Sequence, residues 1–180
     1  MSFLLTLENI LISFQAYRGV HSHYNIETIL DETIFSIMGI AIGVVTLIVI
    51  WMLSKSFSNN MNASTGMLWG FRIAWFAFLF GSAAGGGAML EQSAHTIGLP
   101  DGGNGLPILN WSTKGGDLRI AHFMGIHAIQ IIPLAIYFIY KKLKNNQLAA
   151  NLSIASALLY LGWIVFTFYQ AKAGQPLIEM

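Results

Sequence analysis

Four polar residues interrupt one of the long apolar stretches of the sequence: Arg119, His122, His127 and Gln130. Polar side chains are costly inside a lipid bilayer, so those present usually face protein, a cofactor or a transport pathway. Imidazole nitrogens bind haem iron and transition metals, and imidazole also titrates near neutral pH. The stretch from Gly116 to Gln130 is therefore the first candidate for chemistry in this chain.

These residues fall on one side of a helix. At about 100° per residue, with His122 placed at 0°, Arg119 falls near 60°, Gln130 near 80° and His127 near 140°. We expect such a face in the interior of a helix bundle or against a partner. His122 and His127 lie about 7.5 Å apart along the axis and point about 140° apart, so they cannot both ligate one iron.

A second polar group precedes this helix. Glu91 and His95 are four residues apart, which places them on one helix face. In a haem site, His95 is the expected partner of His122. In a non-haem site, two histidines and a carboxylate (His95, His122 and Glu91) would suit iron, zinc or copper.

Several functions remain open on these residues. The first is a redox protein that binds b-type haem or a metal ion through His122, His127, His95, Arg119 and Gln130. The second is a small transporter or proton-conducting module, and the third is an accessory subunit whose polar face docks on a larger membrane complex. In a purely structural alternative, Arg119 pairs with Asp117 or Glu91, and the other polar residues make interhelical hydrogen bonds.

Composition places these residues in a membrane protein. The chain has 180 residues, of which 55% are hydrophobic and 9% charged, whereas soluble domains carry about 25% charged residues. The net charge of +1 implies no nucleic-acid partner. With no cysteine in the sequence, thiol catalysis, disulfides and iron–sulfur clusters are excluded.

Apolar runs predict an all-α, four-helix up-down transmembrane bundle that forms a single domain over residues 1–180. An interfacial helix is predicted over residues 1–20, and Asp117 is predicted to be the N-cap of the third span. The turn-forming segment Pro100-Asp101-Gly102-Gly103-Asn104-Gly105 belongs to an outer loop over residues 91–116. The predicted spans cover residues 31–53, 67–90, 118–140 and 150–171.

The second half of the second span consists of small residues, Gly81-Ser82-Ala83-Ala84-Gly85-Gly86-Gly87-Ala88. Small residues let helix backbones, or a flat cofactor, approach closely. Helix packing is the interpretation we favour for this segment.

Orientation follows from the lysines of the short connections. Lys141, Lys142 and Lys144 lie between the third and fourth spans, and Lys55 follows the first span. Positive charge favours the cytoplasmic side, so both termini and the loop over residues 91–116 are predicted to lie outside.

The segment Gly116-Asp117-Leu118-Arg119, followed by His122-Phe123, Gly125, His127 and Gln130, resembles a group of bacterial four-helix membrane proteins of unassigned function. The resemblance covers mainly the second half of the chain and includes the closing segment from Gln170 to Pro176. It implies a bacterial setting, hence the inner membrane. The sequence therefore predicts a multi-pass inner-membrane protein with an outward-facing histidine site for haem or a metal ion. Its expected partners are the lipid bilayer, a quinone or another membrane protein, or further copies of itself.

Overall fold

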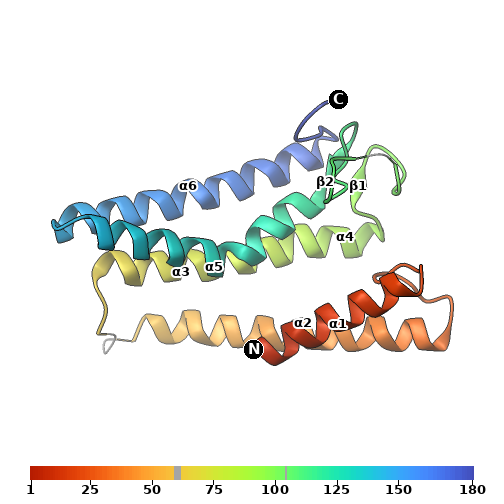
Figure 1. Ribbon diagram of the computed structural model, residues 1–180, viewed down its shortest axis with the longest axis horizontal. Coiled ribbons are helices and arrows are strands. Elements are labelled where there is room, and N and C mark those ends of the chain that lie inside the picture. The colour runs from red at the N-terminus through yellow and green to blue at the C-terminus, as the bar shows by residue number, and fades with distance from the viewer. Residues whose placement is uncertain (59–61, 104) are drawn as a thin grey trace. The chain divides into compact units, whose positions relative to one another are not determined.

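The computed structural model describes residues 1–58, 62–103 and 105–180, and these are mostly helical (Figure 1). In this part of the chain, four helices are long and apolar enough to cross a membrane: Ile29–Ser56, Thr65–Gln92, Leu118–Lys142 and Asn146–Lys172. The prediction of an all-α, multi-pass membrane protein is thereby confirmed, and each span agrees with its predicted range to within a few residues. Asn104, in the predicted turn, lies outside the described residues.

The chain divides into two compact units, Met1–Lys55 and Ser56–Met180. The single domain predicted from the sequence stays a prediction, because this division reports compactness alone. The first unit contains α1 (Ser2–Tyr17) and α2 (Ile29–Ser56). With 16 residues, α1 is shorter than the roughly 20 residues that a spanning helix needs.

The two helices of the first unit are joined by a buried carboxylate. Asp31, which is 2% exposed, accepts hydrogen bonds from Gln15 Nε2 at 2.9 Å and from Arg18 Nη1 at 2.5 Å. Thr28 donates its hydroxyl to the second oxygen of Asp31. A buried charge requires such partners, so this cluster fixes the end of α1 against the start of α2.

The second unit is built on three long helical segments. The first consists of α3 (Thr65–Phe80), a π-helical segment η1 (Gly81–Gly86) and α4 (Gly87–Gln92), and α5 (Leu118–Lys142) and α6 (Asn146–Lys172) follow. Alanine and isoleucine dominate their shared core, which allows the helices to pack closely. The buried core residues are Ile73, Ala74, Ala77, Ala121, Ala128, Ile132, Ile136, Ala157 and Ile164.

A short ribbon closes the end of this unit at which α5 begins. The strands β1 (Thr96–Ile97) and β2 (Gly116–Asp117) pair antiparallel, with Thr96 opposite Asp117. The sequence alone does not predict these strands, because two-residue strands are too short to show a periodic pattern. The predicted N-cap of α5 is confirmed, since the Asp117 side chain accepts a hydrogen bond from Arg119 N at 3.0 Å.

Candidate functional site

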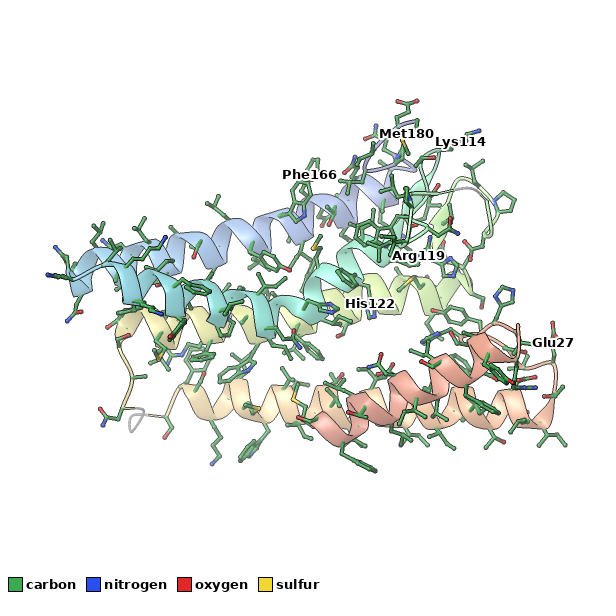
Figure 2. All side chains as sticks on the ribbon, viewed as in Figure 1. Glu27, Lys114, Arg119, His122, Phe166 and Met180 are labelled. Carbon is green, nitrogen blue, oxygen red and sulfur yellow. The ribbon has the colours of Figure 1, made fainter. Side chains whose placement is uncertain are left out.

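His122 contacts the π-helical segment through a side-chain hydrogen bond. Its Nδ1 lies 3.1 Å from the carbonyl oxygen of Gly81. A carbonyl only accepts, so Nδ1 must carry the proton in this bond, and Nε2 of the neutral ring keeps its lone pair. Figure 2 labels His122 on α5, where its half-buried ring lies beside the helix formed by η1 and α4.

The glycines of η1 make this approach possible. A β-carbon added to Gly85 would lie 2.8 Å from His122 Cβ, and one added to Gly86 would lie 3.2 Å from ring atoms Cε1 and Nδ1. Further along, a β-carbon on Gly81 would lie 2.5 Å from the Cα of Gly125. These contacts support the helix-packing interpretation of the small residues. They also assign the glycines a role that the sequence analysis missed, which is to position an imidazole. Single-turn π-helical segments are frequent at functional sites.

His127 has a similar arrangement within its own helix. Its Nδ1 lies 2.7 Å from the carbonyl oxygen of Phe123, and its ring lies against the Phe123 ring with centroids 4.1 Å apart. Trp111 in turn contacts Phe123 edge-on at 5.7 Å. Both imidazoles of α5 therefore direct Nδ1 at a backbone carbonyl. Histidines that ligate a metal through one ring nitrogen commonly make such a hydrogen bond through the other nitrogen.

Arg119 and Asp117 form a structural pair. Arg119 Nη2 and Nε contact the two oxygens of Asp117 at 2.6 and 3.0 Å, and Nη2 also donates to the carbonyl of Asn110 at 2.6 Å. Asp117 is 1% exposed and accepts a further bond from Ser112 N at 2.8 Å. The pairing of Arg119 with Asp117, one of the structural alternatives raised from the sequence, is thus present. It anchors the loop that precedes α5 to the start of that helix.

His95 pairs with an acid that the sequence analysis did not assign to the site. Its Nδ1 lies 2.9 Å from Oδ2 of Asp101, whose carboxylate also accepts hydrogen bonds from the backbone N–H groups of His95 and Thr96. Burial raises the pKa of Asp101, but these donors and the neighbouring imidazole together lower that pKa below its usual value. The signal available in the sequence was an aspartate at the start of a glycine turn, a common acceptor of loop N–H groups.

The shared helix face predicted for Glu91 and His95 is wrong, because α4 ends at Gln92 and Ser93 adopts the left-handed conformation before His95. Glu91 on α4 and Gln130 on α5 are both exposed. In the described part of the chain, no group of three or more His, Asp or Glu side chains is placed to hold a metal ion. The pairing of His95 with His122, and the site formed by His95, His122 and Glu91, therefore stay predictions.

The polar face of α5 is turned away from its neighbours in the second unit. Ala121, Gly125, Ala128, Ile132 and Ile136 are buried, and on the helical wheel they centre near 280°, roughly opposite the polar residues. Packing against α3 and α6 therefore uses one side of α5. His122 lies at the edge of that side, and Arg119, His127 and Gln130 lie beyond it.

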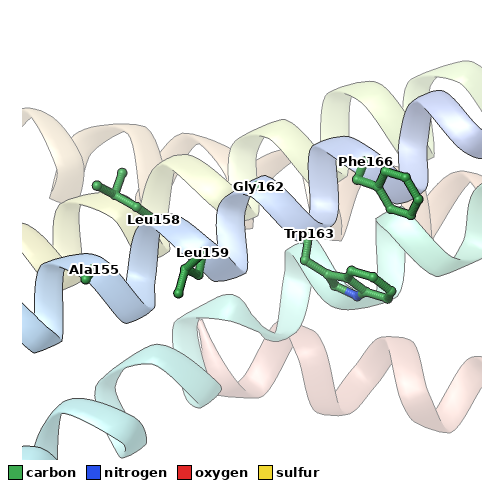
Figure 3. Close-up of a pocket in the computed structure, with 6 residues that line it drawn as sticks. All are labelled: Ala155, Leu158, Leu159, Gly162, Trp163 and Phe166. Carbon is green, nitrogen blue, oxygen red and sulfur yellow. The ribbon is translucent and has the colours of Figure 1, made fainter.

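An open hollow of about 770 Å³ lies on α6 (Figure 3). Its lining contains no titratable side chain, and no histidine contributes to it. The lining residues are Ala155, Leu158, Leu159, Gly162, Trp163 and Phe166. An apolar hollow of this kind offers no group that would orient a polar ligand.

No protein-family model matches the chain, and no curated protein or solved structure matches it.

Proposed function

We propose that the chain is an integral protein of the bacterial inner membrane that holds a b-type haem or a transition-metal ion on α5 for electron transfer. The observation that carries this proposal is the hydrogen bond between His122 Nδ1 and the Gly81 carbonyl at 3.1 Å. It fixes the tautomer in which Nε2 is available as a ligand, and it restrains the ring against an adjoining helix.

His122 is the first ligand in this proposal. His127 has an equivalent tautomer through Phe123, and it serves a second centre because its ring points away from that of His122. His95 is the second-ligand candidate for His122, and its contact with Asp101 through Nδ1 leaves Nε2 as the ligating nitrogen. Bound haem iron, or copper, would supply one-electron chemistry, whereas zinc would not, because Zn²⁺ is redox-inactive.

Orientation and partners complete the proposal. The lysines between α5 and α6 favour a cytoplasmic connection, and the ribbon of β1 and β2, the histidine site and both termini would then lie outside. An electron partner would then be a quinone within the bilayer or another membrane protein. Association with further copies is expected, since so short a chain offers little surface to enclose a cofactor alone.

Absorption spectra of the purified protein in detergent, oxidised and dithionite-reduced, test the proposal together with metal analysis of the same sample. We expect a Soret band that shifts on reduction, or bound iron or copper without one. His122→Ala should abolish cofactor binding and His95→Ala should weaken it. His21→Ala, in a loop of the first unit, is the matched control and should retain the cofactor.

Two results would overturn this proposal. One is full cofactor retention in His122→Ala. The other is a colourless, metal-free wild-type protein that was purified without chelators and does not take up added haemin, iron or copper. The second result would favour the small transporter or the accessory subunit.

The accessory-subunit function has one observation in its favour. The polar side of α5 is not used for packing against α3 or α6, and Gln130 on that side is exposed. A polar helix face in a bilayer is suited to hydrogen bonding with another membrane protein. Purification after mild crosslinking, with Gln130→Leu as the comparison, tests this function. A partner that is lost in Gln130→Leu would support it.

A further inference from the structure

We propose that the groove between the start of α3 and the end of α5 binds an anionic phospholipid, with one acyl chain in the groove and the phosphate at Lys141. The groove has a volume of about 500 Å³, within the usual range for small-molecule sites. It lies at the opposite end of α5 from the histidines. Its lining residues are Met67, Phe71, Pro133, Ile136, Tyr137, Tyr140 and Lys141.

The lining suits a molecule that is apolar along most of its length and charged at one end. Methionine, phenylalanine and isoleucine side chains form the wall, and Lys141 lies in the last turn of α5. Lys141 Nζ lies 5.7 Å from the centre of the Tyr137 ring. Tyrosine and lysine at a helix end mark the level of the lipid headgroups. The wall therefore lies at acyl-chain depth, and the ammonium lies at phosphate depth.

Charge at this end of the unit is not compensated by acids. The sequence has no acidic residue between Glu32 and Glu91 and none between Asp117 and Glu179. Lys142 and Lys144 follow Lys141 within three residues, so all the charged residues of the connection to α6 are basic. Basic residues between or beside transmembrane helices attract anionic headgroups by about 1 kcal/mol each, which is about a fivefold change in affinity.

The polar end of the groove is held in place by one side-chain contact between helices. Ser64, the N-cap of α3, donates its hydroxyl to Tyr140 at 2.9 Å. A β-carbon on Gly66 would lie 2.7 Å from the same Tyr140 oxygen, so the phenol lies directly against the first turn of α3. The positive end of the α3 dipole therefore faces the same region as Lys141 and adds to its attraction for a phosphate.

Native mass spectrometry of the full chain in detergent provides the test, with phosphatidylglycerol and phosphatidylcholine of identical acyl chains added in equal amounts. We expect phosphatidylglycerol to bind at least about fivefold better. Lys141→Gln should reduce that preference by about fivefold. Lys142→Gln removes the same charge from a residue that does not line the groove, and it should retain most of the preference.

A second pair of variants tests the acyl-chain part. Met67→Trp fills the groove and should weaken binding of both lipids. Leu68→Trp places the same bulk outside the lining and should not. Equal binding of the two lipids by the wild type, or equal losses in Lys141→Gln and Lys142→Gln, would overturn the proposal. So would displacement of phosphatidylglycerol by an equal concentration of inorganic phosphate, because the acyl chain would then contribute nothing.

Discussion

The two ends of the interface between the second and third spans are packed in different ways. At the histidine end, formed by η1 and the first half of α5, backbone meets backbone: Gly81 lies against Gly125, and Gly85 against His122. At the lysine end, formed by the start of α3 and the end of α5, side chains fill the space. There the Ile136 side chain reaches into the position left open by Gly70, and a groove of about 500 Å³ remains.

The difference relates packing to the chemistry of each end. Where backbone packs against backbone, the structure can adjust very little, which suits a residue whose ring must keep one orientation. Flexible side chains can adjust around a lipid chain. Pro133 interrupts α5 where the groove of the lysine end begins. Proline removes a backbone donor and bends a helix, and α5 is visibly bent in Figure 1.

The sharpest test of this comparison adds one methyl group to each end. Gly81→Ala places its β-carbon against the Cα of Gly125, which cannot move aside, so we expect a loss of about 2 to 3 kcal/mol in stability. Gly70→Ala meets the terminal methyl of Ile136, which can rotate away, so we expect a loss of about 1 kcal/mol or less. Unfolding by SDS in mixed micelles measures both.

Gly87→Ala is the control for this pair. A β-carbon there meets nothing within 4 Å, so the variant reports only the gain in helix propensity, up to about 1 kcal/mol. Equal losses of stability for Gly81→Ala and Gly70→Ala would show that both ends accommodate an added methyl group equally well. That result would contradict the difference in packing between them.

The two N-caps provide a smaller test of the same contrast. Asp117 at the histidine end is buried and accepts bonds from Ser112, Arg119 N and the Arg119 guanidinium. Asp117→Ala should cost about 2 kcal/mol, a value moderated by the partial exposure of Arg119. Ser64 at the lysine end is exposed and accepts from Met67 N at 3.4 Å. Ser64→Ala should cost about 0.5 to 1 kcal/mol.

Thermal unfolding followed by size-exclusion fluorescence measures both cap variants. Lys114→Ala, at an exposed position in the loop before α5, should leave the unfolding temperature unchanged. An equal or larger loss for Ser64→Ala would mean that the lysine end is held as firmly as the histidine end.

Much of the fold could be predicted from the sequence because the bilayer imposes simple rules. Apolar runs located all four spans, and Asp117 was identified as a cap because a carboxylate just before an apolar run suits a helix N-terminus. The ribbon of β1 and β2 could not be predicted, since its pairing depends on contacts between residues about twenty positions apart along the chain.

The site was predictable in its residue types but not in its partners. The helical wheel placed His122 and His127 on one broad face of α5, but Gly81 and Phe123 as their acceptors follow from close backbone geometry. The sequence offered His95 as a partner of His122, whereas in the structure His95 pairs with Asp101. An aspartate at the start of a glycine turn signals an acceptor of loop N–H groups, but which imidazole it meets depends on how the turn folds.

The smallest expected effect is a pH response confined to the histidine end. The pKa of Asp101 is lowered in the folded protein, so its contacts with His95 and Thr96 contribute stability above the usual aspartate pKa of about 3.9. That contribution is lost as the pH falls through the lowered value.

Hydrogen exchange, corrected for intrinsic rates, should show loosening of residues 93–103 in acid. In Asp101→Asn, residues 93–103 should already be loosened at pH 6, and their corrected exchange rate should be the same at pH 6 and pH 3. The lysine end carries no carboxylate and should not respond. If residues 93–103 of the wild type show the same protection at pH 6 and pH 3, the Asp101 contacts do not hold the loop. If the end of α5 loosens in parallel with them, the acid response is global.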